Sequence, residues 1–389
     1  MSTDTSTDFD LLKSKNEEGG VDAMLEALVE QLRAKRQPHQ LFEALKMQVR
    51  QQMALPLQYT EQSDDLTDEQ REQLENGLLE ACREVGAMLL KDGQIREGWM
   101  YLRPVGDREA ASAMLAEIEP DDENLDDLVE VLLGESVDVA RGFRLVIENF
   151  GICNAITTFE SQLGNHGRRE QQAAAGLLVR HLHHELCENL ATDIGRQEGA
   201  TPTGESSIRS LVADREWLFN ENTYHVDTTH LSSVVRFARL LDDPETLRLA
   251  LDLTEYGRHL STQFQYQSDE PFADNYPAHA IYFRGLLGED VDQAIEYFGK
   301  KAETVDQGEF GTLAIEVFVD LLSRLGRHQE AIDAAIRLSP ADARPLGIAP
   351  SLLELSQRAQ QFDQMLDFCR QQNDLLGYAT GLAYHAAKK

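Results

Sequence analysis

Residues 315–338 read IEVFVDLLSRLGRHQEAIDAAIRL, and this stretch predicts a helix, a tight turn at Gly326 and a second helix that folds back on the first. Apolar residues recur at spacings of three and four on both sides of the turn, which places them on one face of each helix. They are Ile315, Phe318, Val319 and Leu322 before the turn, and Ala331, Ile332, Ala335 and Leu338 after it. Because such a hairpin cannot bury both apolar faces by itself, it needs neighbours of the same kind. The stretch therefore predicts a stack of antiparallel helical hairpins.

Helical patterns continue through the rest of the chain. Two helices are expected between residues 21 and 51 with a break near Pro38. Thr67 followed by Gln70 predicts a capping box at the start of the next helix. No segment alternates apolar and polar residues long enough to indicate a strand. The predicted fold class is all-α, built from stacked antiparallel helical hairpins.

The length of the chain, 389 residues, exceeds what one compact core usually serves, so two lobes or one elongated solenoid are expected. A helix break at Gly151 and a long helix over 169–194 precede the polar segment QEGATPTGESS. Its small and polar residues are typical of a linker. We therefore expect an N-terminal helical lobe over 1–196, a linker over 197–207 and a C-terminal helical-repeat lobe over 208–389.

Four segments resemble degenerate tetratricopeptide units. They are REVGAMLLKDGQIREGWMYLRP (83–104), AHAIYFRGLLGEDVDQAIEYFGKKA (278–302), the stretch 315–338, and SLLELSQRAQQFDQMLDFCRQQND (351–374). In the first, Gly86, Leu89, Gly93, Gly98 and Leu102 stand near the family's small and large packing positions, and Leu322, Gly326 and Ala331 occupy equivalent places in 315–338. The resemblance implies a tetratricopeptide-like α-solenoid with a concave surface, commonly a peptide-binding role, and no catalysis.

Acidic residues number 68 against 36 basic residues, so the formal net charge is -32. A surface so negative repels phosphate backbones and anionic lipids, which argues against nucleic acid and membranes as partners. The N-terminal MSTDTSTDFD lacks the basic and apolar regions of a signal peptide, and no run reaches the roughly 18 apolar residues of a membrane span. The cysteines (Cys82, Cys153, Cys187 and Cys369) lie far apart and predict buried thiols in a reducing compartment. We expect a cytoplasmic protein.

Histidine and carboxylate side chains suggest one candidate metal site in two pieces. In VRHLHHELCENL (179–190), His181 and Glu185 lie one helical turn apart and have the ligand types of helix-bundle metal sites. The alternative is a solvated face with His–Glu pairs. In NTYHVDTTHL (222–231), His225, Asp227 and His230 have the ligand types of a two-histidine, one-carboxylate site.

The alternative for Asp227 is an ordinary N-cap for a helix that starts at Thr228. If the two pieces meet in space, the five residues could bind one divalent ion of zinc, iron or manganese. In that case the protein would be a metal-dependent hydrolase or oxidoreductase that uses Arg236 or Arg239 to orient an anionic substrate. If the two pieces do not meet, no cofactor is expected.

Arginines and aromatic residues of the C-terminal lobe form a candidate anion-binding surface. The residues are Arg236, Arg239, Arg248, Arg258, Tyr224 and Trp217. Guanidinium groups that face one concave surface could hold a carboxylate or an acidic peptide. The alternative is ion pairing within the chain to Asp242, Asp243, Glu245 and Asp252.

Phosphate-binding loops, dinucleotide fingerprints, nucleophile elbows and kinase signatures are all missing from the sequence. The leading hypothesis is therefore a non-catalytic helical-repeat scaffold that binds a protein or peptide partner on its concave face. The metal-dependent enzyme is the alternative.

Overall fold

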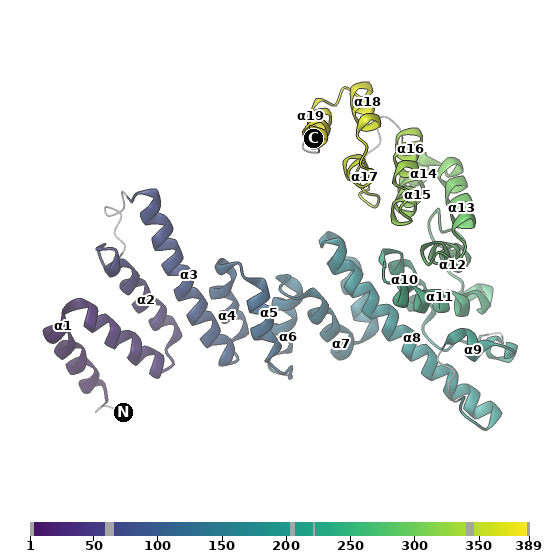
Figure 1. The fold of residues 1–389 in the computed structure, drawn as a ribbon. Helices are drawn as coiled ribbons and strands as arrows, with labels where there is room; N and C mark the ends of the chain where they lie inside the picture. Colours follow the sequence, from purple (N-terminus) through teal and green to yellow (C-terminus); the bar gives the residue numbers. More distant parts are fainter. Residues whose placement is uncertain (1–3, 59–65, 203–206, 221, 340–345, 387–389) are drawn as a thin grey trace. The chain divides into compact units, whose positions relative to one another are not determined.

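The computed structural model describes residues 4–58, 66–202, 207–220, 222–339 and 346–386. Throughout these ranges the regular secondary structure is helical and no strand occurs, which confirms the predicted all-α class (Figure 1). The chain forms two compact units, Met1–Asn149 and Phe150–Lys389. Of the helices that the structure describes, none combines the length and the apolar character that a bilayer span requires.

The first unit is a succession of helices in which neighbours along the chain contact one another, α1 with α2, α2 with α3 and α3 with α4. The helices are α1 (Asp4–Ala34), α2 (Pro38–Gln52), α3 (Asp68–Lys91), α4 (Ile95–Leu102), α5 (Arg108–Ala116) and α6 (Leu125–Val129), and α7 (Val139–Ser161) begins in this unit. The predicted capping box is confirmed, because the Thr67 hydroxyl accepts from the Gln70 amide and the Gln70 side chain accepts from the Thr67 amide.

Small residues let α3 and α4 approach closely, as the predicted hairpin over 83–104 requires. A Cβ atom added to Gly86 would lie 2.6 Å from Cγ of Leu102, and one added to Gly98 would lie 2.7 Å from Cδ2 of Leu90. Leu102 and Leu90 are both buried in one hydrophobic cluster of this unit. The two glycines therefore serve packing between the helices.

Gly151 interrupts α7, as predicted. Its backbone has φ 81° and ψ 168°, a conformation outside the helical region that glycine adopts without steric cost. The division between the two units falls beside this break. The predicted linker over 197–207 lies inside the second unit, where α8 continues to Glu198, and its residues 203–206 lie outside the described residues.

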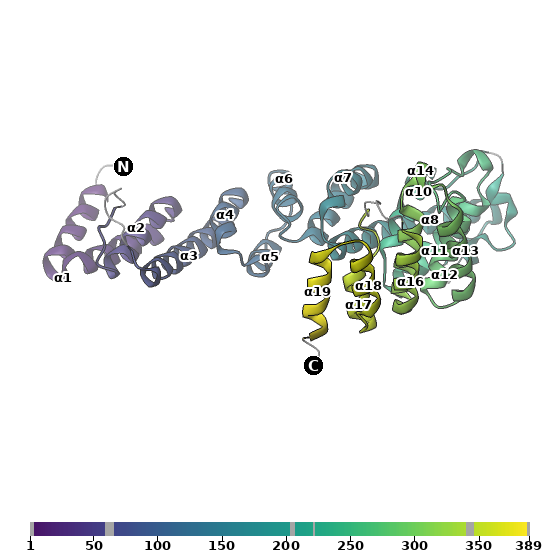
Figure 2. The same cartoon turned by 90° about the horizontal axis from the view of Figure 1, so that it is seen from above.

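In the second unit, helices again contact their neighbours in chain order. The helices are α8 (Arg168–Glu198), α9 (Ile208–Val212), α10 (Thr228–Phe237), α11 (Pro244–His259), α12 (Asn275–Leu286), α13 (Val291–Thr304), α14 (Gln307–Phe310), α15 (Leu313–Arg324), α16 (His328–Leu338), α17 (Leu352–Ala359), α18 (Asp363–Gln371) and α19 (Leu375–Ala386). The long α8 packs against α9, α10 and α11. Further along the chain, α11 contacts α12, α12 contacts α13, α13 contacts α15, α15 contacts α16, and α16 contacts α17. In Figure 2, α16, α17 and α19 lie side by side.

The stretch 315–338 forms the hairpin that its pattern predicts. The turn is made by Gly326, whose φ of +75° is favourable for glycine, and the Arg327 amide donates to the Leu322 carbonyl at 2.9 Å. The predicted apolar face is buried in both helices, although Ala335 and Leu338 at its end are only half-buried.

The cysteines follow the prediction only in part. Cys82 and Cys369 are buried, Cys187 is half-buried and Cys153 is exposed, so the expectation of four buried thiols is wrong for Cys153. The physical reason is local, since the helix after Gly151 buries Ala155 and turns Cys153 outward to solvent.

Replacement of Gly257 by alanine is expected to lower the free energy of unfolding by about 1–2 kcal/mol. Gly257 on α11 touches the buried ring of Tyr276 on α12, and an added Cβ would lie 2.5 Å from two ring carbons. Overpacking of this kind costs about 1–3 kcal/mol and outweighs the helix propensity that alanine adds. Urea unfolding measures the change. Gly164→Ala is the matched control, because a Cβ there meets nothing within 4 Å and stability should change by about 0.5 kcal/mol or less.

Candidate functional site

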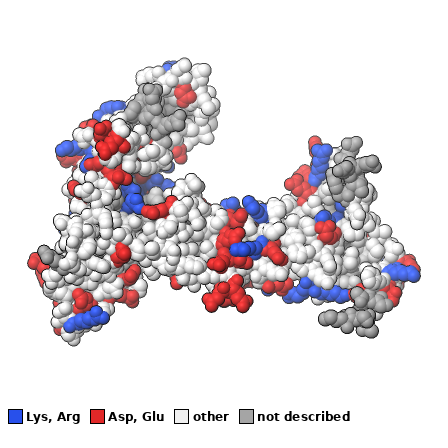
Figure 3. Space-filling view, turned by 180° about the vertical axis from the view of Figure 1, so that it is seen from behind, with Lys and Arg blue, Asp and Glu red and all other residues white. Residues whose placement is uncertain are grey.

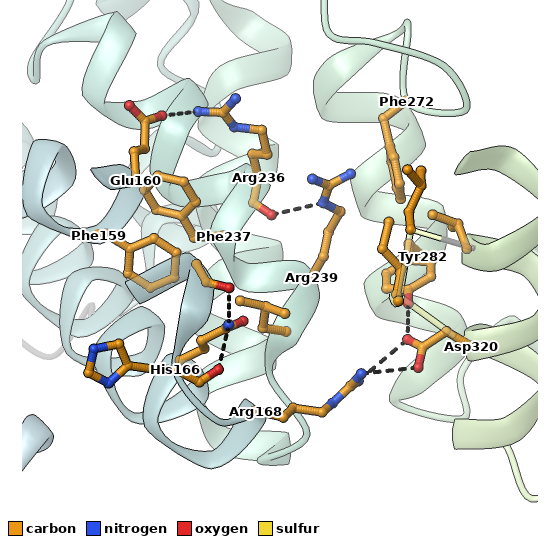
Figure 4. Close-up of a pocket in the computed structure, with 17 residues that line it drawn as sticks. Phe159, Glu160, His166, Arg168, Arg236, Phe237, Arg239, Phe272, Tyr282 and Asp320 are labelled. Atoms are coloured by element: carbon orange, nitrogen blue, oxygen red, sulfur yellow. Dashed lines mark hydrogen bonds and ion pairs between the residues drawn. The ribbon is translucent and has the colours of Figure 1, made fainter. Parts of the chain in front are cut away.

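A cavity of about 780 Å³ lies within the second unit, bounded by residues from five separate stretches of the chain (Figure 4). The segment from the end of α7 to the start of α8 supplies Phe159, Glu160, Gly164, His166, Arg168 and Gln171. The end of α10 and the turn after it supply Arg236, Phe237, Arg239 and Leu240. The opposite side consists of Phe272, Tyr282, Val317, Asp320, Leu346, Gly347 and Ile348. On the face drawn in Figure 3, basic side chains lie in a hollow of this unit.

The wall formed by α7 and α10 is held by aromatic packing. The rings of Phe159 and Phe237 stack with centroids 4.2 Å apart and planes 24° from parallel. Beside them, Arg236 on α10 forms an ion pair with Glu160 on α7. This pair satisfies the charge of Arg236 within the wall.

Asp320 on α15 joins three segments at the other wall. Two nitrogens of Arg168 donate to its two oxygens at 3.2 and 3.4 Å, and the hydroxyl of Tyr282 donates to Oδ2 at 3.2 Å. Nη1 of Arg324 lies 3.5 Å from the same oxygen. Asp320 is only 4% exposed, so this network is largely shielded from water. Burial raises the pKa of Tyr282 to about 12, which keeps its hydroxyl protonated and able to donate.

The rim over 346–348 is held by the buried carboxylate of Glu316. Its Oε1 accepts from the amide of Leu346 at 2.6 Å and from the hydroxyl of Thr312 at 2.6 Å, and its Oε2 accepts from the amide of Ile348 at 2.9 Å. The carboxylate thus fixes this edge of the cavity to α15.

Arg239 differs from the other arginines of the cavity. Its Nε donates to the Arg236 carbonyl at 2.9 Å, and its guanidinium carbon lies 4.8 Å from the centroid of Phe272. With respect to the described residues, it forms no ion pair, and its two terminal nitrogens make no hydrogen bond (Figure 4). Burial lowers the pKa of Arg239 to about 10 with a smaller contribution from the charge of Arg236, while Tyr282 and the carboxylate of Asp269 act in the opposite direction. At neutral pH the cavity therefore contains a charged guanidinium with two donors facing open space.

Only part of the predicted anion-binding surface lines the cavity. Arg236 and Arg239 meet there, as the sequence suggested. Arg248 and Arg258 are exposed on α11, where Arg258 pairs with Glu255 at 3.3 Å. Tyr224 is exposed and packs edge-on against Phe264, and Trp217 is half-buried; neither lines the cavity.

The carboxylates proposed as internal partners of these arginines mostly serve elsewhere. Asp242 lies 2.9 Å from Nε of Arg324, and Asp243 accepts from the Thr246 amide as the N-cap of α11. Sequence reasoning missed Arg168 and Asp320, whose partnership spans 152 positions and leaves no local signal.

The predicted metal ligands occupy separate structural roles. On α8, His181 is exposed and Glu185 is half-buried. His225 has Nε2 3.4 Å from Asp193 and Nδ1 3.0 Å from the hydroxyl of Tyr256, and burial lowers its pKa although Asp193 acts in the opposite direction.

Asp227 is the N-cap of α10 and accepts from the amides of Thr229 at 2.8 Å and His230 at 3.3 Å, as the alternative interpretation anticipated. Throughout the part of the chain that the structure describes, no group of three or more histidine, cysteine or acidic side chains is arranged to hold a metal ion. The metal site stays a prediction.

A thiol, an imidazole and a carboxylate lie in the order of a nucleophilic triad between α8 and α11. Sγ of Cys187 is 3.7 Å from Nδ1 of His183, and Nε2 of His183 is 3.4 Å from Asp252. Burial, followed by the charge of Asp252, raises the pKa of Cys187 to about 11. The sulfur is therefore a thiol at neutral pH, which makes it a poor nucleophile and indicates a packing role.

The cavity thus combines accessible space with the guanidinium of Arg239, which has no ion-pair partner among the described residues. In comparisons with known proteins, no protein-family model, no curated protein and no solved structure matches the chain. The geometry and charge of this cavity are therefore the features that bear on function.

Proposed function

We propose that the protein is a non-catalytic scaffold of tetratricopeptide-like hairpins that binds a protein or peptide partner through the cavity around Arg239. The hairpin at Gly326 and the contacts between successive helices support the repeat architecture. Stacked helical hairpins typically offer extended concave surfaces to partners. The partner is expected to present an anionic group to the cavity.

The unpaired guanidinium of Arg239 is the observation that carries this proposal. Arg239 is half-buried and forms no ion pair with the described residues, and a charge partly withdrawn from water in this way costs free energy of folding. Such costs are concentrated at functional sites. A partner carboxylate could accept from both terminal nitrogens of Arg239 in the bidentate geometry that guanidinium groups favour. Binding would then supply the missing counter-ion.

The shape and lining of the cavity are also suited to a side chain of a partner. Its volume of about 780 Å³ falls within the range of roughly 300–1,000 Å³ that is usual for binding pockets. Four aromatic rings contribute to the walls, namely those of Phe159, Phe237, Phe272 and Tyr282. The rings are at most 7% exposed and make the walls rigid, so an apolar side chain next to the anionic group would bury its surface against Leu346 and Ile348 of the rim, which are 58% and 37% exposed.

Selection of peptides against the intact chain tests the proposal. Peptides that bind the natural protein are selected from a random library in which both peptide ends are capped. The affinity of each selected peptide is then measured for the natural protein and for the Arg239→Met variant. Loss of the paired guanidinium is expected to weaken binding by about tenfold or more. Arg248→Met on the exposed face of α11 is the matched control and should leave affinity unchanged. If neither this library nor one with free C-termini yields a peptide sensitive to Arg239, the proposal is refuted.

The same variant has an expected effect on stability that separates a binding residue from a structural one. Arg239→Met removes a cation–π contact and one hydrogen bond, each contributing about 1 kcal/mol. It also removes the desolvation of an unpaired charge, which is of at least similar size. The free energy of unfolding in urea should therefore stay constant or rise. A fall of about 3 kcal/mol or more would assign Arg239 to the fold instead.

A further inference from the structure

A second cavity of about 470 Å³ adjoins the cavity around Arg239. Arg168, Asp320, Gly347 and Ile348 line both, so the two form one continuous surface within the second unit, here called the double cavity. The second cavity is further lined by Arg169, Gln172, Asp242, Arg324, Ala349, Pro350, Glu354 and Arg358. Because the same residues line both cavities, the cavities lie side by side, and one extended ligand can contact both.

The second cavity also contains arginines without carboxylate partners. Arg169 and Arg358 are exposed and form no ion pair with any residue that the structure describes, although Nη1 of Arg358 donates to the hydroxyl of Ser323 at 2.8 Å. Glu354 accepts from the amide and the hydroxyl of Ser351, each at 2.8 Å, and the Ser351 contacts lower its pKa, with a smaller contribution from the nearby charge of Arg358. Its carboxylate is therefore engaged as the cap of α17.

The double cavity carries an excess of positive charge in a strongly negative protein. Six arginines and four carboxylates line it, whereas the chain as a whole has a formal charge of -32. An excess of two cations fits a ligand with two separate negative charges. It does not fit a nucleic acid, because a polyanion would be repelled by the surrounding surface.

Resting on the proposed function, we infer that the ligand is an extended internal segment of a partner protein that lies along both cavities. One acidic side chain pairs with Arg239, and a second one pairs with Arg169 and Arg358. An apolar residue of the segment packs against the exposed side chains of Leu346 and Ile348 on the rim near Arg239. The charge pattern of the double cavity thus selects a segment with two acidic residues separated along the chain and an apolar residue close to the first.

Double-mutant cycles with a peptide selected on Arg239 test this inference. The probe is that peptide with an acetylated N-terminus and an amidated C-terminus, and its acidic residues are changed singly to glutamine or asparagine. The loss of affinity caused by Arg239→Met should be non-additive with the change of one acidic residue of the peptide, which shows that the two interact. Arg169→Gln combined with Arg358→Gln should be coupled to another acidic residue and weaken binding by about three- to tenfold, because these arginines are exposed. Arg248→Gln is the control outside both cavities.

Three results would overturn the inference, and they can be told apart from failure of the proposed function. If Arg169→Gln with Arg358→Gln leaves affinity unchanged while Arg239→Met abolishes binding, the ligand occupies the first cavity alone. If Arg239→Met and the Arg169→Gln, Arg358→Gln variant are both coupled to the same acidic residue of the peptide, the ligand does not use two separate acidic residues. If the capped library yields no binder but a library with free C-termini yields peptides that lose affinity in Arg239→Met, the ligand is a chain end. If neither library yields a peptide that depends on Arg239, the proposed function fails together with the inference. Melting curves of each variant show that it is folded.

Discussion

Replacement of Asp320 by alanine is expected to lower the free energy of unfolding of the second unit by about 2–3 kcal/mol, the cost of hydrogen bonds to a charged group. Asp320 is 4% exposed and is the shared counter-ion of Arg168 and Arg324. Its removal also leaves the hydroxyl of the buried Tyr282 without an acceptor at that position. The loss is limited because Arg324 keeps its pair with Asp242 at 2.9 Å and the side chain of Arg168 is 40% exposed to solvent. Urea unfolding followed by circular dichroism measures it.

A surface ion pair in the same unit provides the matched control for Asp320. Glu303 lies 2.9 Å from Arg337, and both side chains are exposed. Glu303→Ala should cost less than about 1 kcal/mol, since solvent screens such pairs. In the Asp320→Ala background, Arg168→Met should restore part of the lost stability because it removes one of the charges left without a partner. An effect of Asp320→Ala as small as that of Glu303→Ala would contradict the network described here.

Acidification is expected to destabilise the second unit through His279, by about 1.4 kcal/mol for each pH unit within the affected window. His279 on α12 is 0% exposed and stacks on Phe272 with ring centroids 4.3 Å apart. Its Nδ1 lies 2.6 Å from the carbonyl of Asn275 and must donate to it, so Nε2 carries no proton in the neutral ring. Burial, together with the positive charge of Arg239, lowers the pKa of His279 to about 3.

The direction of this effect follows from proton binding in the two states. The pKa of an unfolded histidine is about 6.5, so between that pH and the folded pKa the unfolded chain binds more protons. Stability from His279 is therefore complete above about pH 6.5 and declines as the pH falls toward 3. Burial lowers the pKa of His225 as well, and its contribution has the same sign.

Urea unfolding at several pH values between about 7 and 5 checks the histidine prediction. His279→Phe keeps a ring against Phe272 and removes the titration, so its stability should depend less on pH than that of the natural protein. His184 on α8, whose side chain is 75% exposed, supplies the control substitution His184→Phe, which should leave the pH dependence unchanged. An unaltered slope in His279→Phe would show that other groups cause the acid sensitivity.

The cavity illustrates which features of a site leave a signal in the sequence. Arg236 and Arg239 could be selected as anion-binding candidates because they lie close together on a helix of a very acidic chain. Their partners could not. Arg236 pairs with Glu160, which is 76 positions away, and no local pattern indicates that pairing. The sequence therefore pointed to two arginines but could not tell which of them would lack a counter-ion.

By itself, the amino-acid sequence determined the helical class, the turn at Gly326, the break at Gly151 and the caps at Thr67 and Asp227. These features depend on apolar spacing, glycine conformation and hydrogen bonds between residues a few positions apart, so they can be read from short segments. The tertiary structure alone decided that Arg168 meets Asp320 and that Arg239 faces a cavity without a partner. Electrostatic partnership depends on which distant segments the fold brings together and how deeply it buries them, and neither quantity is encoded in local spacing.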